Sequence, residues 1–224
     1  MSAQTSDAVL PPANEPRTVD PGEPIAFDPW IDDLDYNGGG TAYADLLEAF
    51  CEAREALAAS MADESTMRSV TLQLRDVTAT LGESGVEPGN GFSGRRYDLP
   101  GRGHPGLVPA VTTSWATNVI TADVRFDASH VGGRGAVHGG IVPLLFDELL
   151  GRLSNANREV PCRTAYLRTD YHRVTLPYVD YLFDATVDEE VGRKRFLSAR
   201  LTAPDGFVVA SAHGLFVALR NGAP

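Results

Sequence analysis

The sequence has few cysteines, almost no lysine and no long apolar run. Its two cysteines, Cys51 and Cys162, lie in unrelated contexts without a CxxC or Cys/His ligand spacing. The chain therefore signals neither a disulfide framework nor a zinc site, and it predicts no bound metal. The longest apolar runs are far shorter than the roughly 20 residues of a membrane helix, and the polar N-terminus lacks a basic leader segment. We expect no membrane span and a cytoplasmic location.

Charge is divided unevenly along the chain. Residues 1–90 carry 17 acidic and 4 basic side chains, residues 91–224 carry 13 acidic and 15 basic ones, and the net charge is −11. An acidic chain is a poor match for nucleic acid, so we expect no nucleic-acid partner. The second part concentrates basic residues within 163–173 and at Arg193-Lys194-Arg195. These side chains either hold a phosphorylated small ligand or are solvated charges at strand edges and turns.

Three segments precede the main domain. Residues 1–40 are rich in Pro, Asp and Glu and predict an extended, partly disordered arm. Residues 41–85 predict a helical extension of two helices, at about 41–62 and 65–81, because apolar residues recur there at helical spacing. Residues 86–108 are rich in Gly, Pro and Arg and predict a linker, so we expect the main domain at 109–220.

The main domain contains several strand patterns and one helical segment. Alternating patterns predict strands at 115–126, 163–171, 181–187, 195–203 and 207–219. The helix that follows the first strand has apolar residues on all sides, so it must be enclosed rather than laid on a surface. The pattern predicts an α+β fold in which a five-stranded antiparallel sheet wraps around one long central helix.

The start of this helix carries the first part of a candidate site. His138-Gly139-Gly140 precedes the helix, and Pro143 is tolerated only near a helix start, which places both glycines at or just before the first turn. We expect the amides of Gly139 and Gly140 to be free and to stabilise charge on a substrate oxygen. The alternative is that the glycines only permit a tight turn. His138 is either a base or a residue that holds this turn.

Two carboxylates, Asp147 and Glu148, lie inside the same apolar helix, where a carboxylate needs a partner or a function. Asp147 lies seven residues beyond Gly140, on the same helix face but about 10 Å further along. It cannot attack a carbonyl held by Gly140 of its own chain. We therefore expect a homodimer in which Asp147 of one subunit approaches the glycines of the other. Glu148 points about 100° away and is the rival candidate.

Residues 101–220 resemble the hotdog-fold acyl-CoA thioesterases, the superfamily of PaaI-like proteins and of thioesterase superfamily member 4. The motifs that carry the resemblance are Gly135-x-x-His138-Gly139-Gly140, Asp147, Thr164-Ala165, Asp170-Tyr171-His172-Arg173, Gly192-Arg193-Lys194 and Gly214-Leu215-Phe216-Val217. The resemblance implies the hotdog fold and the hydrolysis of an acyl-CoA to a free acid and CoA. It implies no cofactor apart from the CoA that belongs to the substrate.

The resemblance also assigns the catalytic residues. It makes Asp147 the general base or the nucleophile, with His138, Gly139 and Gly140 orienting and polarising the thioester. Thr164 stands where related enzymes place a hydroxyl near the reacting water, although a β-branched residue is also ordinary in a strand. The choice between base and nucleophile stays open.

The same resemblance places Asp170 and His172 along the CoA channel and Arg193 and Lys194 near the CoA phosphates, for which basic side chains are suited. Lys194 is the only lysine of the chain. The helical extension lies outside the resemblance, and it could join dimers into a higher oligomer.

One departure from the family pattern keeps other functions open. Many PaaI-like proteins carry an asparagine six residues before the histidine, where this chain has Gly132. That departure puts the positioning of water in doubt. The alternatives are a non-catalytic acyl-CoA-binding protein and a hotdog hydratase or dehydratase, although Asp127 and His130 fit the latter poorly. The sequence does not reveal which acyl group is bound.

Overall fold

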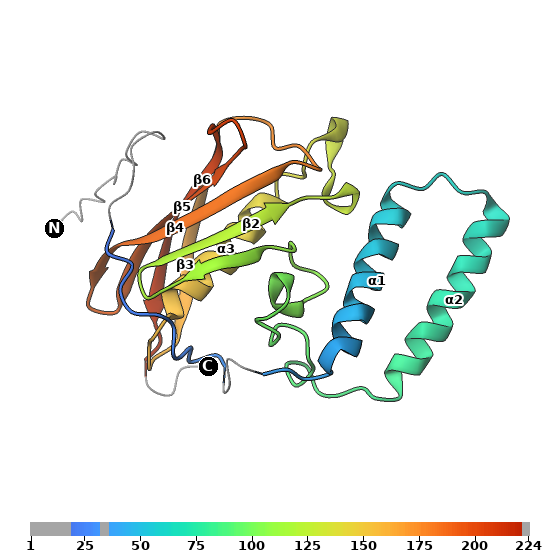
Figure 1. Cartoon of the computed structure of the whole chain (residues 1–224), viewed down its shortest axis with the longest axis horizontal. Helices are drawn as coiled ribbons and strands as arrows, with labels where there is room; N and C mark the ends of the chain where they lie inside the picture. Colours follow the sequence, from blue (N-terminus) through green and yellow to red (C-terminus); the bar gives the residue numbers. More distant parts are fainter. Residues whose placement is uncertain (1–18, 32–35, 221–224) are drawn as a thin grey trace.

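One antiparallel sheet of six strands packs against helix α3 (Ile141–Asn155) in the computed structural model, which describes residues 19–31 and 36–220. The strands are β1 (Val111–Trp115), β2 (Val119–Arg125), β3 (Cys162–Tyr171), β4 (Asp180–Val191), β5 (Lys194–Thr202) and β6 (Val208–Ala218). Their order is β1-β2-β4-β5-β6-β3, so β1 and β3 form the edges. Figure 1 shows α3 on one face of this sheet, which confirms the predicted arrangement of an antiparallel sheet around one helix.

The sheet contains one strand more than the sequence indicated. The prediction of a single strand over 115–126 is wrong, because the chain reverses at Thr117 and Asn118 and forms a β1–β2 hairpin. Trp115 pairs with Ile120 across this hairpin, and the Ala116 N–H donates to the Val119 carbonyl at 2.9 Å. The turn contains neither glycine nor proline, the strongest turn signals, so the pattern alone did not reveal the reversal.

The core lies between α3 and the sheet. Phe146 of α3 and Phe183 of β4 are fully buried, and their ring centroids lie 5.8 Å apart. Leu144, however, is 37% exposed. The expectation that the sheet encloses the helix on all sides is therefore wrong for the stripe that contains Leu144, because one sheet covers only part of the circumference of the helix.

A buried arginine fixes the C-terminal end of α3. Arg195 of β5 is only 2% exposed, and its Nη1 donates to the carbonyls of Leu153 and Ser154 at 3.2 and 2.7 Å. These carbonyls lie in the last turn of the helix, where backbone acceptors lack intrahelical partners. Burial lowers the pKa of Arg195 to about 10, which still leaves the side chain cationic at neutral pH. Arg195 thus serves the fold and not a phosphate group.

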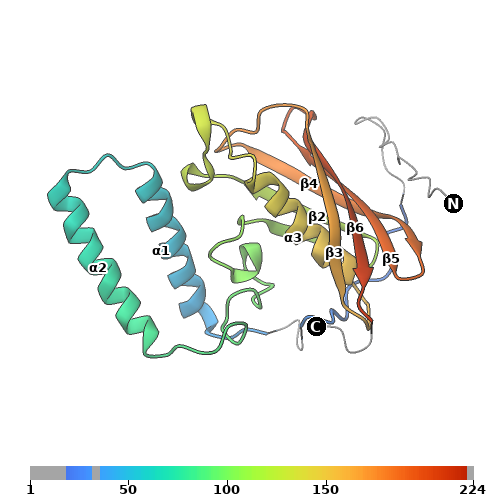
Figure 2. The same ribbon diagram turned by 180° about the vertical axis from the view of Figure 1, so that it is seen from behind.

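Two helices precede the sheet, α1 (Gly40–Ala58) and α2 (Glu64–Gly82), and both stand to one side of it in Figures 1 and 2. Helix α1 is attached to the following segment, since the Tyr43 hydroxyl donates to the Gly103 carbonyl at 2.7 Å and Arg54 donates to the Pro105 carbonyl at 2.8 Å. Helix α2 has no buried residue. No helix in the described part of the chain is both long and apolar enough to cross a membrane.

The part of the N-terminal arm within residues 19–31 runs along the sheet and the end of α3. Pro24 forms an isolated antiparallel bridge with Ala116, and the Asn157 side chain donates to the Pro24 carbonyl at 2.9 Å. Asn157 also accepts from the Ala26 N–H at 2.8 Å. Residues 1–18 and 32–35, which also belong to the predicted arm, lie outside the described residues.

We predict that Arg195→Met destabilises the fold by about 3 kcal/mol, because it leaves the buried carbonyls at the end of α3 without donors. Urea unfolding at neutral pH measures this loss. Lys194→Met is the matched control, since the neighbouring Lys194 is exposed and its replacement should change the free energy of unfolding by less than about 0.5 kcal/mol. Equal effects of the two changes would contradict the role assigned to Arg195.

Candidate active site

The turn before α3 is held by hydrogen bonds on both sides. The His138 N–H donates to the His130 carbonyl at 2.8 Å, and the Gly140 N–H donates to Nδ1 of the His138 ring at 3.0 Å. The expectation of two free amides is therefore wrong for Gly140, because the histidine ring folds back and accepts its proton. His138 is thus the residue that holds the turn, and an unprotonated Nδ1 leaves the proton of the neutral ring on Nε2.

Gly139 is the glycine whose amide stays available. Its N–H has no hydrogen-bond partner among the described residues, and its carbonyl accepts from the Tyr171 hydroxyl of β3. His138 and Gly139 are both exposed. The start of α3 therefore offers one free backbone N–H beside a ring N–H, at the end of the helix where the helix dipole favours negative charge.

The structure brings together two predicted site residues, Asp147 and Thr164. The Thr164 hydroxyl of β3 donates to Asp147 Oδ1 at 2.9 Å, and the Asp147 side chain remains partly accessible. Asp147 forms no ion pair with any described residue. A carboxylate that is oriented by one hydroxyl and paired with no cation keeps its lone pairs for a substrate or a water molecule.

Glu148 has the opposite environment. Its side chain is 14% exposed and forms a two-pronged ion pair with Arg102, whose Nη2 lies 2.6 Å from Oε2. The segment that delivers this arginine, η1 (Pro100–Gly103), contains three successive residues with positive φ, at 57°, 57° and 68° for Gly101, Arg102 and Gly103. Arg102 is a non-glycine residue, which is uncommon at positive φ. The backbone that places Arg102 against Glu148 is therefore somewhat strained.

A cavity of about 260 Å³ opens beside the two carboxylates. Its lining includes Asp147, Glu148, Arg102, Arg152, Thr164 and Tyr97. Burial raises the pKa of Tyr97 to about 12, so its hydroxyl stays protonated at neutral pH. The cavity therefore presents charged and hydrogen-bonding groups next to Asp147. Among the described residues, no cluster of His, Cys, Asp or Glu could hold a metal ion.

The sequence reasoning missed Arg102 and Arg152 at this cavity. Arg102 lies in the stretch 86–108 that we expected to be only a linker, yet Gly101 and Gly103 on either side were a signal for an unusual backbone. Arg152 lies four residues after Glu148 in an otherwise apolar helix, where a charged side chain also needs a reason.

Comparison with solved structures identifies the architecture. A thioesterase superfamily protein matches with a TM-score of 0.69 and 25% identity, over 80% of this chain and 96% of that chain. PaaI from the E. coli phenylacetic acid degradation operon matches with a TM-score of 0.48 and 14% identity, over 50% and 81% of the two chains. A Streptococcus mutans protein bound to acetyl CoA matches with a TM-score of 0.46 and 16% identity, over 48% of this chain and 86% of that chain. No family model and no curated protein matches the sequence.

The chain has the hotdog fold of the thioesterase superfamily. The first of these matches covers more of the chain than residues 101–220 alone. Part of the segment before the hotdog domain therefore also has a counterpart in that structure.

The residues predicted to bind CoA do not come together within one hotdog domain. Asp170 pairs with Ser211 on β6, whereas Lys194 pairs with Val217 on the same strand, six residues or about 20 Å away. His172 lies at the same end of β6 as Asp170, with its Nε2 2.8 Å from Ser211 Oγ.

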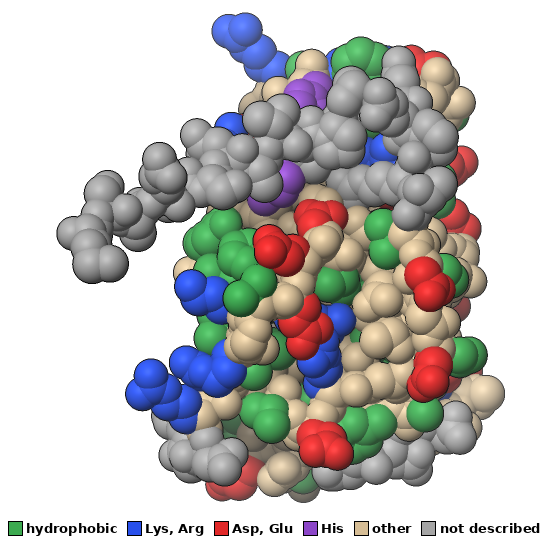
Figure 3. All heavy atoms as spheres, turned by 90° about the vertical axis from the view of Figure 1, so that its left-hand side faces the viewer, with side chains coloured by type: hydrophobic (Ala, Val, Ile, Leu, Met, Phe, Trp, Pro, Cys, Tyr) green, Lys and Arg blue, Asp and Glu red, His purple; other side chains and the backbone are tan. Residues whose placement is uncertain are grey.

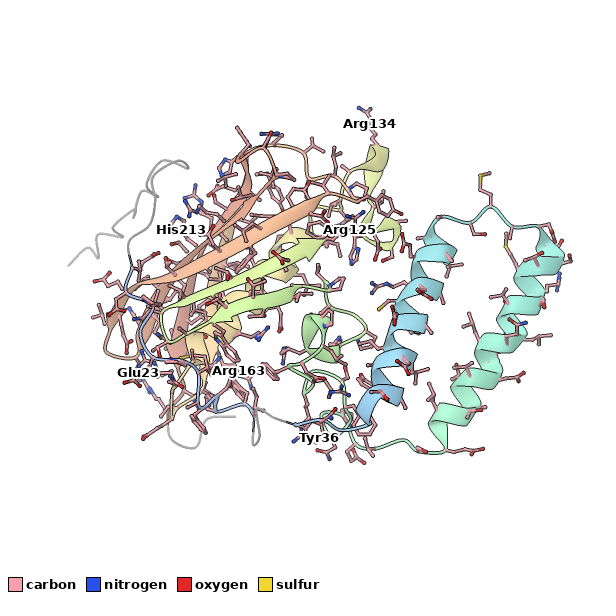
Figure 4. The ribbon with its side chains drawn as sticks, in the orientation of Figure 1. Glu23, Tyr36, Arg125, Arg134, Arg163 and His213 are labelled. Carbon is pink, nitrogen blue, oxygen red and sulfur yellow. The ribbon has the colours of Figure 1, made fainter. Side chains whose placement is uncertain are left out.

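Arg193 lies near Lys194 at the C-terminal end of β6, where it donates to the Ala218 carbonyl at 2.7 Å. Figure 4 marks two opposite ends of the domain, with Arg134 near the start of α3 at one end and Arg163 near the start of β3 at the other. Figure 3 views the molecule from the side of the β4–β5 turn and shows basic side chains next to acidic ones, without a continuous basic patch.

The structure also bears on the hydratase alternative and on Gly132. Asp127 and His130 form a local cap, in which the His130 ring accepts from the Asp127 N–H at 3.1 Å and is almost fully buried. The hydrogen bonds of these two residues are thus made within the loop itself. A Cβ at Gly132 would lie 3.0 Å from His138 Cα, so a larger residue at this position would press on the His138 turn.

We predict that Glu148→Gln and Asp147→Asn differ in their effect on stability. The first change leaves Arg102 without its carboxylate in a mostly buried site and should lower the free energy of unfolding by about 3 kcal/mol. The second keeps an acceptor for Thr164 and should cost less than about 1 kcal/mol. Urea unfolding of both variants at pH 7 measures the difference, and comparable losses would contradict the contrast between the two carboxylates.

Proposed function

We propose that the protein is an acyl-CoA thioesterase that uses Asp147 to hydrolyse the thioester to a free acid and CoA. The observation that carries this proposal is the contrast between two neighbouring carboxylates on α3. Arg102 neutralises Glu148, whereas Asp147 is held only by the Thr164 hydroxyl at the edge of a cavity. Different surroundings of two acids are a usual sign of different roles. Structural similarity to a thioesterase superfamily protein supports the same activity.

Either chemical route for Asp147 gives the same products. As a base, Asp147 takes a proton from water while the water oxygen attacks the thioester carbon, and the carbon–sulfur bond breaks as the thiolate leaves and takes up a proton. As a nucleophile, the carboxylate displaces the thiolate to give a mixed anhydride, which water then hydrolyses. In both routes Thr164 orients the carboxylate.

The carbonyl oxygen of the thioester gains negative charge during attack. We assign its stabilisation to the free Gly139 N–H together with the His138 ring, whose Nε2 carries the proton when Nδ1 accepts from Gly140. Gly140 acts by fixing that ring. The Tyr171 hydroxyl supports the same turn through the Gly139 carbonyl.

The two halves of this site belong to different subunits in the proposal. Gly140 and Asp147 of one helix are separated by about 10 Å along its axis, too far for one carbonyl to contact both. The open stripe of α3 that contains Leu144 lies between them, and the neighbouring edge strand β3 exposes Tyr166. Exposed apolar side chains beside an unpaired strand edge favour a second copy as the cover.

A homodimer also explains the scattered CoA-binding set. Asp170 and His172 lie at one end of β3 and β6, and Arg193 and Lys194 lie at the other. We propose that a single CoA contacts the first pair on one subunit and the second pair on its partner. The exposed apolar side chains of α2, including Leu74 and Val77, are available for joining such dimers into a higher oligomer.

We predict that Asp147→Asn lowers kcat for acyl-CoA hydrolysis at least a thousandfold, because an amide neither takes the proton nor attacks the carbonyl. Release of free thiol from a panel of short, long and aryl acyl-CoAs measures this loss. Full activity in the variant would overturn the role of Asp147. If the wild-type protein binds acyl-CoA but hydrolyses none of the panel, the non-catalytic binding function replaces the thioesterase.

A second prediction tests the shared site. Asp147→Asn and His138→Ala should each be inactive alone, but mixed after unfolding and refolding together they should regain about a quarter of the wild-type activity. Half of the dimers are then mixed, and each contains one intact site out of two. Refolded mixtures that stay inactive, while the refolded wild-type protein recovers, would contradict a site built from two chains.

A further inference from the structure

Arg152 of α3 is a buried cation with little to balance it. Its side chain is 7% exposed, and the one hydrogen bond that it donates runs from Nη1 to Thr112 Oγ1 at 2.8 Å. Its Nε is buried without a partner. The guanidinium lies over the rings of Trp115 and Tyr97, 4.6 and 4.9 Å from their centroids. These contacts hold the charged group in place, and no described residue accepts a hydrogen bond from its Nη2.

No carboxylate of the described residues lies within 4.0 Å of Arg152. Glu148 is engaged by Arg102, and Asp28 is a buried acid that accepts from the Trp30 N–H at 2.9 Å. Burial lowers the pKa of Arg152, while the nearby Glu148 and Asp28, which line the same cavity, act in the opposite direction. A buried cation without a paired anion is costly, and a bound anion would remove that cost.

We propose that Arg152 binds a carboxylate at the far end of the acyl group, so that the preferred substrates are CoA thioesters of short dicarboxylic acids. This inference rests on the proposed thioesterase function, because it takes Asp147 as the group that attacks the thioester. Arginine is well suited to such recognition, since its planar donors match the two oxygens of a carboxylate.

The geometry of the cavity fits an acyl group of this kind. Asp147, Thr164 and Arg152 line the same cavity, and Asp147 and Arg152 are five residues or about 7.5 Å apart along the helix axis. Five steps of about 100° also place the two side chains about 140° apart around the helix, so a short dicarboxylic chain has to follow the wall of this cavity to reach both groups. The cavity volume of about 260 Å³ lies just below the roughly 300–1,000 Å³ of sites for drug-sized ligands, which suits a short acyl group.

The test compares acyl-CoAs of matched chain length with and without the terminal carboxylate. Glutaryl-CoA is paired with pentanoyl-CoA and adipyl-CoA with hexanoyl-CoA, and kcat/KM is measured for each. We expect the wild-type enzyme to favour the dicarboxylic member by about tenfold or more, since a hydrogen-bonded ion pair of this kind is worth at least that ratio. Equal or inverted ratios in the wild-type enzyme would overturn the inference.

Substitutions of Arg152 test whether this residue causes the preference for dicarboxylic substrates. Arg152→Gln should abolish the preference, mainly by raising KM for the dicarboxylic substrates, and Arg152→Lys should retain part of it. The matched control is Arg125→Gln, an exposed arginine of β2 far from the cavity (Figure 4), which should keep the wild-type ratio. Retention of the full preference in Arg152→Gln would show that another group recognises the carboxylate and would overturn the assignment.

Pantetheine thioesters separate recognition of the acyl end from recognition of the CoA phosphates. Glutaryl-pantetheine should still be favoured over pentanoyl-pantetheine, and Arg152→Gln should still remove that preference. An effect of Arg152→Gln that is the same for all CoA esters and absent for all pantetheine esters would place Arg152 at a phosphate instead. That result would overturn the inference.

One measurement needs no variant, in case Arg152→Gln fails to fold. Glutarate should raise the melting temperature of the wild-type protein at concentrations where pentanoate has no effect, and equal effects of the two acids would count against the inference. Hydrolysis of none of the acyl-CoAs would instead refute the proposed thioesterase function. Hydrolysis without a preference for dicarboxylic substrates refutes only the role of Arg152.

Discussion

The packing of α3 against one face of the sheet determines where every candidate group of the site lies. Arg195 holds the C-terminal carbonyls of the helix, and the His138 turn fixes its start. Between these two points Phe146 enters the core, so the residues on the opposite side of the helix face outward. Asp147 lies toward that open side, and its access to a substrate follows from how the helix is rotated in the core.

The adjacent acids Asp147 and Glu148 have different hydrogen-bonding partners, and both partners come from outside the helix. Glu148 meets Arg102, which arrives from a left-handed turn at 101–103, while Asp147 meets a threonine hydroxyl from β3. A full ion pair stabilises the first carboxylate and occupies its oxygens. A single hydroxyl orients the second and leaves it without an ion-pair partner among the described residues, so the segment before the sheet, through Arg102, makes the surroundings of the two acids differ.

The turn at the start of α3 illustrates how a local hydrogen bond changes a chemical assignment. The sequence placed Gly139 and Gly140 together as donors, and the structure divides their roles because the His138 ring accepts from Gly140. That hydrogen bond also fixes the tautomer of the neutral ring. In the proposed site, the His138 ring and the Gly139 amide therefore replace the two glycine amides as donors toward the substrate oxygen.

The sequence by itself determined the helix–sheet architecture and the position of α3, and the family resemblance selected Asp147 and Thr164 as site residues; their hydrogen bond was seen only in the structure. Periodicity and a proline near a helix start are local properties, so they can be read from neighbouring residues. The β1–β2 reversal, the exposed stripe at Leu144 and the partners of Arg102, Arg152 and Arg195 were decided only by the tertiary structure. Each depends on groups that are distant along the chain, and the energy of a buried charge is set by which of those groups the fold brings within a few ångströms of it.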